Sequence, residues 1–247
     1  MKKIFHLINF ELNNVLKKLL FLCFSMILTE IILLCITISN GKNYYLRFED
    51  LLKTAGYPVI FFLFLAVLLA LLIFNFYCNF FGSREIYTLM TLPGSRNNLF
   101  YSKFTCSVLS ILFYTAVQIA GIYFSYFVVY STIPEDIPVM NNALLLAFLR
   151  SDFLRIILPL DPFSLSVSII CLVSISAAVN FAVICERSRK IFRAVFILII
   201  IFIDFISVFP LYEQTIWKTL FCAAIIIVCT VYMIQYSVKA LKSSLIL

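Results

Sequence analysis

The sequence predicts an all-α membrane protein with six transmembrane helices, and three observations lead to this fold class. Of the 247 residues, 64% are hydrophobic and only 13% are charged, whereas soluble domains carry about 25% charged residues. Six apolar runs reach the ~20 residues that a helix needs to cross a bilayer core. These runs lack the apolar–polar alternation of a membrane β-barrel. We therefore predict a single transmembrane domain over residues 1–247.

The six predicted spans are separated by polar or Pro-containing segments. They cover residues 19–39, 57–81, 104–130, 163–185, 191–211 and 217–238. The fifth has the poorest pattern, because Arg193 and Asp204 interrupt it and Pro210 ends it. The run that starts at Leu19 is longer than the apolar region of a signal peptide and has no A-x-A-like end, so we expect a retained anchor.

The distribution of Lys and Arg orients the predicted spans, because these residues accumulate on the cytosolic side of a membrane. With a cytosolic N-terminus, that side holds thirteen of the 19 cations. They are Lys2, Lys3, Lys17, Lys18, Arg84, Arg96, Lys103, Arg187, Arg189, Lys190, Arg193, Lys239 and Lys242. Both termini are therefore predicted to be cytosolic. The same bias accounts for the net charge of +7, so no nucleic-acid partner is expected.

Residues 1–18 have an amphipathic pattern. Apolar residues recur at helical spacing, and Asn13, Asn14, Lys17 and Lys18 occupy the other faces. This pattern is typical of an interfacial helix that contacts the lipids of the inner leaflet. The alternative is a cytosolic extension of the first span.

Residues 141–158 are apolar but carry charges in the middle. Burying Arg150, Asp152 and Arg155 in lipid would be costly. We therefore expect an interfacial helix on the outer side rather than a further span.

The segment from Gly82 to Lys103, GSREIYTLMTLPGSRNNLFYSK, joins the second and third predicted spans. It is polar, basic and too short to be a domain. Ser83 is a suitable N-cap for a short helix over residues 83–92, and Pro93 ends that helix. Arg84 and Glu85 make one end of it charged. Its apolar residues, which suit a groove on a partner protein, are Ile86, Tyr87, Leu89, Met90 and Leu92. The alternative is an ordinary basic loop.

One order of residues in this segment resembles a known family. The pattern E-x-x-T-L-x-T-L-P-x-S-R-x-x-L-x-x-S-K-F is similar to permeases of type-2 ABC transporters. Its residues are Glu85, Thr88, Leu89, Thr91, Leu92, Pro93, Ser95, Arg96, Leu99, Ser102, Lys103 and Phe104. The six spans, the N-terminal amphipathic helix and the orientation agree with that family over most of the chain. The segment between predicted spans five and six is shorter than is usual in the family.

The resemblance implies that the segment is a cytosolic coupling helix that docks on an ATPase. The implied contact residues are Ser83, Arg84, Glu85, Tyr87, Thr88, Leu89, Leu92, Pro93 and Arg96. A second contact is implied at Arg187 and Arg189, within the basic run 186–193. The alternative for that run is an anchor for lipid phosphates.

Several polar residues inside the predicted spans are candidates for a substrate path. Glu30 and Asp204 lie near the middle of their spans, and intramembrane acids mark functional sites. Polar and small residues, which include Tyr114, Gln118 and Ser125, follow one face of the third span. Such a face either packs helices together or lines a route. The acids either attract a cationic substrate or hold helices together.

The resemblance implies a bacterial cytoplasmic-membrane exporter of a hydrophobic, amphipathic or cationic peptide-like substrate. ATP and Mg²⁺ would bind a separate ATPase, because the chain has no Gly-rich phosphate loop, and no catalytic set or metal site is expected in this chain. The implied partners are cytosolic ATPase subunits, a second copy or a related permease, and membrane lipids. Two alternatives remain: an ion- or proton-coupled transporter that uses the intramembrane acids, and a non-transporting scaffold or receptor subunit.

Overall fold

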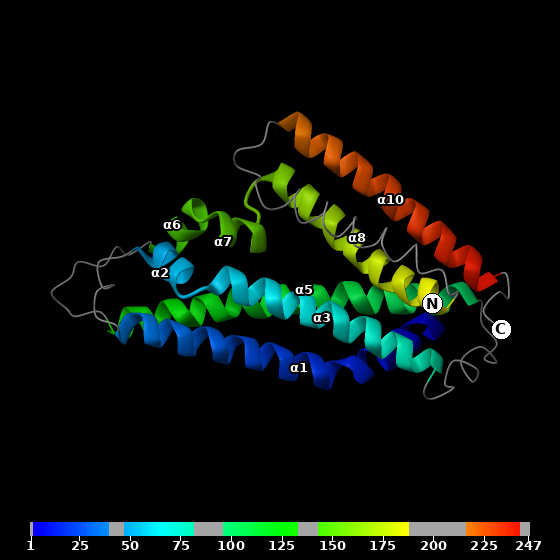
Figure 1. The fold of residues 1–247 in the computed structure, drawn as a ribbon, viewed down its shortest axis with the longest axis horizontal. Coiled ribbons are helices and arrows are strands. Elements are labelled where there is room, and N and C mark those ends of the chain that lie inside the picture. The colour runs from blue at the N-terminus through cyan, green and yellow to red at the C-terminus, as the bar shows by residue number, and fades with distance from the viewer. Residues whose placement is uncertain (1, 40–46, 82–95, 133–142, 188–215, 243–247) are drawn as a thin grey trace. The chain divides into compact units, whose positions relative to one another are not determined.

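A computed structural model describes residues 2–39, 47–81, 96–132, 143–187 and 216–242, and these residues are helical throughout most of their length (Figure 1). The described helices are α1 (Lys2–Ser39), α2 (Phe48–Thr54), α3 (Tyr57–Phe81), α5 (Arg96–Thr132), α6 (Ala143–Arg150), α7 (Asp152–Ile157), α8 (Pro162–Arg187) and α10 (Ile216–Lys242). No strand occurs in the described ranges. The all-α class predicted from the sequence is confirmed for them.

Five of the described helices are long and apolar enough to cross a membrane, as in a multi-pass membrane protein. Their apolar parts cover Phe5–Ser39, Tyr57–Cys78, Asn98–Thr132, Pro162–Cys185 and Thr219–Ala240. These ranges contain or closely overlap five of the predicted spans. The remaining predicted span, 191–211, lies outside the described residues.

Helix α1 is continuous from Lys2 to Ser39. The predicted amphipathic segment 1–18 is thus not separated from the first span by a break in the helix. No residue from Lys2 to Ser39 is Pro or Gly, and those two residues are the usual causes of such a break. The placement of this segment on a membrane surface stays a prediction.

The described helices form two compact units. Unit 1 comprises Met1–Lys17, Leu69–Ile111 and Ser166–Leu247, and unit 2 comprises Lys18–Leu68 and Leu112–Leu165. Helices α1, α3, α5 and α8 each contribute one part to each unit, with only the first four residues of α8 in unit 2. Buried polar side chains gather in both units, around Glu30 and Gln118 in unit 2 and around Glu11 and Lys103 in unit 1.

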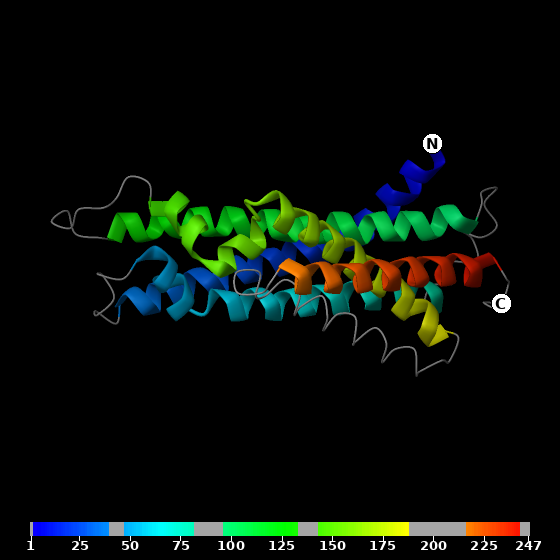
Figure 2. The same cartoon turned by 90° about the horizontal axis from the view of Figure 1, so that it is seen from above.

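In unit 1, α8 and α10 run parallel to each other (Figures 1 and 2). Near their N-terminal ends, Cys171 packs against Ile226. Further along both helices, the rings of Phe181 and Tyr236 meet edge to face with centroids 5.5 Å apart. Both helices therefore advance in the same direction along their interface, where Ala177, Ala178 and Met233 belong to one buried cluster.

In unit 2, the short helix α6 contacts both α2 and α7. The helix is interrupted between α6 and α7 at Ser151. The backbone of Ser151 is extended, and its Oγ accepts a hydrogen bond from the N–H of Leu154. The guanidinium of Arg155 donates to the carbonyl of Leu149 across this break. The expected single helix over 141–158 is thus two helices in its described part. Each is far shorter than the ~20 residues that a span needs.

Helix α2 was not predicted. It has seven residues, with acids in its first turn and Lys53 in its last, as the helix dipole favours. Gly56 follows it with a φ of +79°, which is readily adopted only without a side chain. This turn leads directly into α3.

Candidate functional site

The cluster in unit 2 is centred on a contact between α1 and α5. The side-chain amide of Gln118 donates from Nε2 to Glu30 Oε1 over 2.8 Å. Both residues are almost completely buried, with 1% of Glu30 and none of Gln118 exposed. Glu30, which was predicted as a candidate from its position in the first span (α1), therefore has a defined partner, Gln118, on the third (α5).

Gly121 lies one helical turn beyond Gln118 and lets α1 approach α5. A Cβ at this position would lie 3.4 Å from Ile27 Cγ1 and 3.7 Å from Glu30 Oε2. Small residues allow such close approaches between helices in lipid. Gln118 and Gly121 are three residues apart and therefore lie on the same face of α5. On that face Gln118 supplies a polar group, and the missing side chain of Gly121 leaves room for α1.

Two tyrosines tie α3 to α5 in the same unit. Tyr114 donates from its hydroxyl to the carbonyl of Phe61 over 2.7 Å. The hydroxyls of Tyr57 and Ser125 lie 2.7 Å apart, and Ser125 donates its only hydroxyl proton to the carbonyl of Gly121. Tyr57 must therefore be the donor to Ser125. Both tyrosines lie within electrostatic range of Glu30.

The structure thus brings together four of the five residues predicted for a substrate path. Glu30, Tyr114, Gln118 and Ser125 are all buried and engaged in hydrogen bonds between or within helices. Asp204 lies outside the described residues. In the described conformation this face of α5 packs against other helices, and all four side chains are closed off from solvent.

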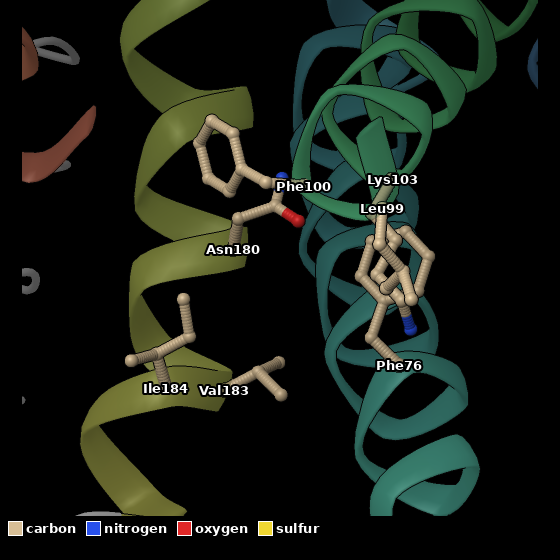
Figure 3. Close-up of a pocket in the computed structure, with 7 residues that line it drawn as sticks. All are labelled: Phe76, Leu99, Phe100, Lys103, Asn180, Val183 and Ile184. Atoms are coloured by element: carbon tan, nitrogen blue, oxygen red, sulfur yellow. The ribbon is translucent and has the colours of Figure 1, made fainter. Parts of the chain in front are cut away.

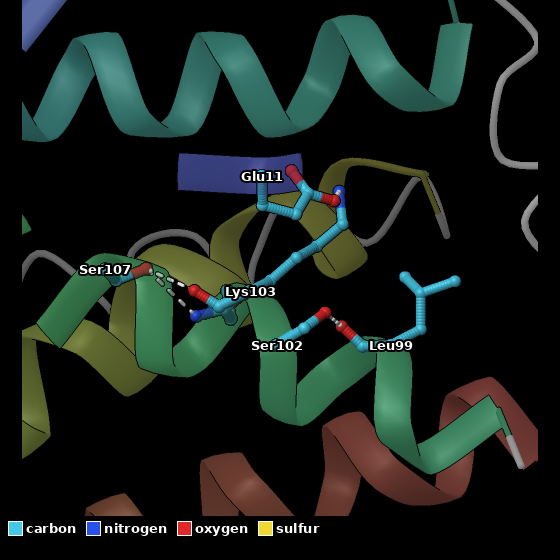
Figure 4. A network of polar contacts seen from close by, with 6 residues as sticks. Glu11, Leu99, Ser102, Lys103 and Ser107 are labelled. Atoms are coloured by element: carbon cyan, nitrogen blue, oxygen red, sulfur yellow. Dashed lines mark hydrogen bonds and ion pairs between the residues drawn. The ribbon is translucent and has the colours of Figure 1, made fainter. Parts of the chain in front are cut away.

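The cluster in unit 1 contains a buried ion pair between α1 and α5 (Figure 4). Lys103 Nζ lies 3.5 Å from Glu11 Oε1, and only 4% of Lys103 and 1% of Glu11 are exposed. The same ammonium lies 4.9 Å from the centre of the Phe76 ring on α3. A cation over an aromatic face is attracted to it, more strongly where water is absent. Lys103 therefore connects three helices.

Helix α8 joins this cluster through Asn180. Its Nδ2 donates to Ser176 O on its own helix and, over 3.4 Å, to Ser107 Oγ on α5. Ser107 in turn donates to the carbonyl of Lys103. Lys103 therefore makes polar contacts through both its side chain, with Glu11, and its backbone carbonyl, with Ser107.

A small cavity lies beside Lys103 (Figure 3). Its lining comes from α3, α5 and α8 and comprises Phe76, Leu99, Phe100, Lys103, Asn180, Val183 and Ile184. Its volume of about 10 Å³ barely reaches the ~10–15 Å³ that one water molecule needs. In this conformation the cavity therefore cannot hold a substrate.

Most of the predicted coupling residues lie outside the described residues. These are Ser83, Arg84, Glu85, Tyr87, Thr88, Leu89, Leu92, Pro93 and Arg189. Arg96 is the first residue of α5 and Arg187 the last of α8. The end of the family-like pattern is described: Leu99, Ser102 and Lys103 are buried at the start of α5.

Glu11 was not predicted from the sequence as a functional residue. A signal was present, because Glu11 continues a buried face of α1. The buried residues on that face are Glu11, Val15, Leu19, Leu22, Met26, Glu30 and Leu34, spaced three or four apart. Both acids of α1 thus face the protein interior.

Comparison with known proteins yields no relative. No protein-family model, curated protein or solved structure matches this chain. Among the described residues, no group of three His, Cys, Asp or Glu side chains gathers as metal ligands would.

Proposed function

We propose that this chain is the membrane permease subunit of an ATP-driven ABC exporter. The observation that carries the proposal is the position of Lys103, at the end of the family-like pattern and inside the packed start of α5. Residues 82–95 precede α5 directly. A force applied to this segment would therefore act on a helix that already contacts α1, α3 and α8.

The shape of α5 suits the transmission of such a force. It has 37 residues from Arg96 to Thr132, which corresponds to a length of about 55 Å. It contains no Pro, and its only Gly is Gly121, so the usual causes of a sharp kink are few. The continuous helix α5 thus runs from Arg96, next to the proposed coupling segment, to Gln118, which pairs with Glu30.

The directions of α8 and α10 support the six-span arrangement. Neighbouring parallel helices require the chain between them to return to the starting side. The 28 residues from 188 to 215 contain the predicted span 191–211, which is long enough for that return. With this span included, both termini are assigned to the cytosol.

In the proposed mechanism, this chain supplies the path and a separate cytosolic ATPase binds ATP and Mg²⁺. ATP binding drives the spans between inward- and outward-facing states because the ATPase binds ATP differently in the two states. Two permease chains, identical or related, would pair in the membrane. The substrate class we assign is a hydrophobic, amphipathic or cationic peptide-like molecule, on the basis of the family resemblance.

Substitution of the apolar part of the coupling segment tests this proposal. The chain would be purified with a co-expressed candidate ATPase, and ATP hydrolysis would be measured in nanodiscs. We expect Y87A/L89A to reduce the stimulation of hydrolysis at least several-fold. The matched control is L160A, because Leu160 is apolar, half exposed and on the opposite side of the predicted topology. Equal stimulation by the unsubstituted chain and Y87A/L89A would reject the coupling role.

A further inference from the structure

Two buried oxygen atoms at the contact between Glu30 and Gln118 lack a donor. Glu30 Oε2 and Gln118 Oε1 have no hydrogen-bond partner in the part of the chain that the structure describes, and both are inaccessible to solvent. A buried acceptor without a donor costs about 1–3 kcal/mol, and a charged one costs more. Two such atoms on adjoining side chains require an explanation.

The existing hydrogen bond limits the possible explanations. Gln118 Nε2 and Glu30 Oε1 already join one edge of the amide to one edge of the carboxyl group. The two atoms without donors are the remaining atoms of the same two planar groups. One hydrogen atom, carried by Glu30 Oε2 and donated to Gln118 Oε1, would satisfy both.

The surroundings of Glu30 do not compensate a negative charge. Among the described residues, no Lys or Arg forms an ion pair with Glu30, and Arg150 pairs with Glu49 instead. A buried carboxylate with a single neutral donor is strongly disfavoured relative to its neutral form.

The other titratable groups near Glu30 are also committed elsewhere. Tyr57 on α3 and Tyr114 on α5 lie within its electrostatic range. Tyr57 donates to Ser125 and Tyr114 donates to the carbonyl of Phe61. Neither hydroxyl is therefore available to donate to Glu30 Oε2.

We propose that Glu30 and Gln118 form a proton-binding site, in which Glu30 Oε2 carries a proton and donates it to Gln118 Oε1. The two parallel hydrogen bonds then join α1 to α5 as a neutral carboxyl–carboxamide ring. Gln118 supplies both the donor and the acceptor of this ring, so its amide orients the protonated carboxyl group, whereas the burial of Glu30 disfavours the charged form. This assignment does not rest on the proposed transport function.

Infrared spectroscopy of the full chain in nanodiscs at neutral pH tests the proposal. A protonated carboxyl group has a carbonyl stretch well separated from carboxylate bands, and the stretch shifts when H₂O is replaced by D₂O. We expect this band in the unsubstituted protein and its loss in E30Q. The matched control is E49Q, because Glu49 is paired with Arg150 and its replacement should remove carboxylate bands instead.

A second variant, Q118L, keeps the acid and removes its partner. The carbonyl band should persist and move to higher frequency, since its hydrogen bonds are lost. Absence of a protonated carboxyl band from the unsubstituted protein would overturn the proposal whatever the variants do. Loss of carboxylate bands in E30Q would also overturn it. Carboxylate bands that respond to added sodium would assign the site to a metal cation instead and thereby reject a bound proton.

Discussion

The ammonium of Lys103 and the carboxylate of Glu11 form an ion pair that is almost completely removed from water. Ion pairs in such places are not strong contributors to stability, because desolvation offsets much of the attraction. Loss of one partner has a much larger effect, since the other charge is left buried. This asymmetry makes the pair a sensitive probe of the packing at the start of α5.

We expect E11Q and K103M each to lower the free energy of unfolding by about 3–5 kcal/mol. The double variant E11L/K103M should recover most of that loss, because no buried charge remains. Denaturant titration in detergent would measure these changes. R150M is the control, since Arg150 is half exposed and its pair should contribute at most about 1 kcal/mol. If the double variant instead lost the sum of the two single losses in unfolding free energy, Glu11 and Lys103 would not form a buried ion pair.

The hydroxyls of Tyr57 and Ser125 should respond unequally to removal. S125A leaves the Tyr57 donor buried without an acceptor, which costs about 1–3 kcal/mol. Y57F leaves Ser125 with its bond to the carbonyl of Gly121, so its cost should be nearer 1 kcal/mol. Unfolding measurements on the two single variants and the double variant check this order. A larger loss of unfolding free energy in Y57F than in S125A would contradict the assignment of Tyr57 as the donor.

Gly121 should tolerate one added methyl group but not a larger side chain. In G121A, the new Cβ meets Ile27 and Glu30 at ordinary contact distances, and Ala favours the helix by about 1 kcal/mol. We therefore expect G121A to be neutral or slightly stabilising. G121L should lose about 1–3 kcal/mol through overpacking. Unchanged stability in G121L would show that α1 does not approach α5 at this residue.

The sequence is sufficient to predict the long helices, because each depends on a continuous apolar run. It also predicts the polar face of α5, since Tyr114, Gln118, Gly121 and Ser125 recur every three or four residues. The pairing of Gln118 with Glu30 was not predicted, because 88 residues separate them in the chain. Only the packing of α1 on α5 brings them together.

The short helices show a different limit of sequence-based prediction. Helix α2 has too few residues for a periodic pattern. The charges at Arg150, Asp152 and Arg155 argue against a span, yet they do not locate the break at Ser151. That break depends on a local cap, in which Ser151 accepts from Leu154. Glu11 was missed because an acid at helical spacing with apolar residues is easily assigned to a solvated face.

The proposed coupling requires residues 82–95 to face the cytosol, where an ATPase can reach them. Its most direct test is labelling of single cysteines, in a chain whose eight native cysteines have been replaced, with a membrane-impermeant maleimide. We expect S83C and L92C to react only after the cells are permeabilised, whereas L160C reacts in intact cells. If S83C and L92C react in intact cells and L160C does not, the segment faces outward and the proposed coupling is contradicted.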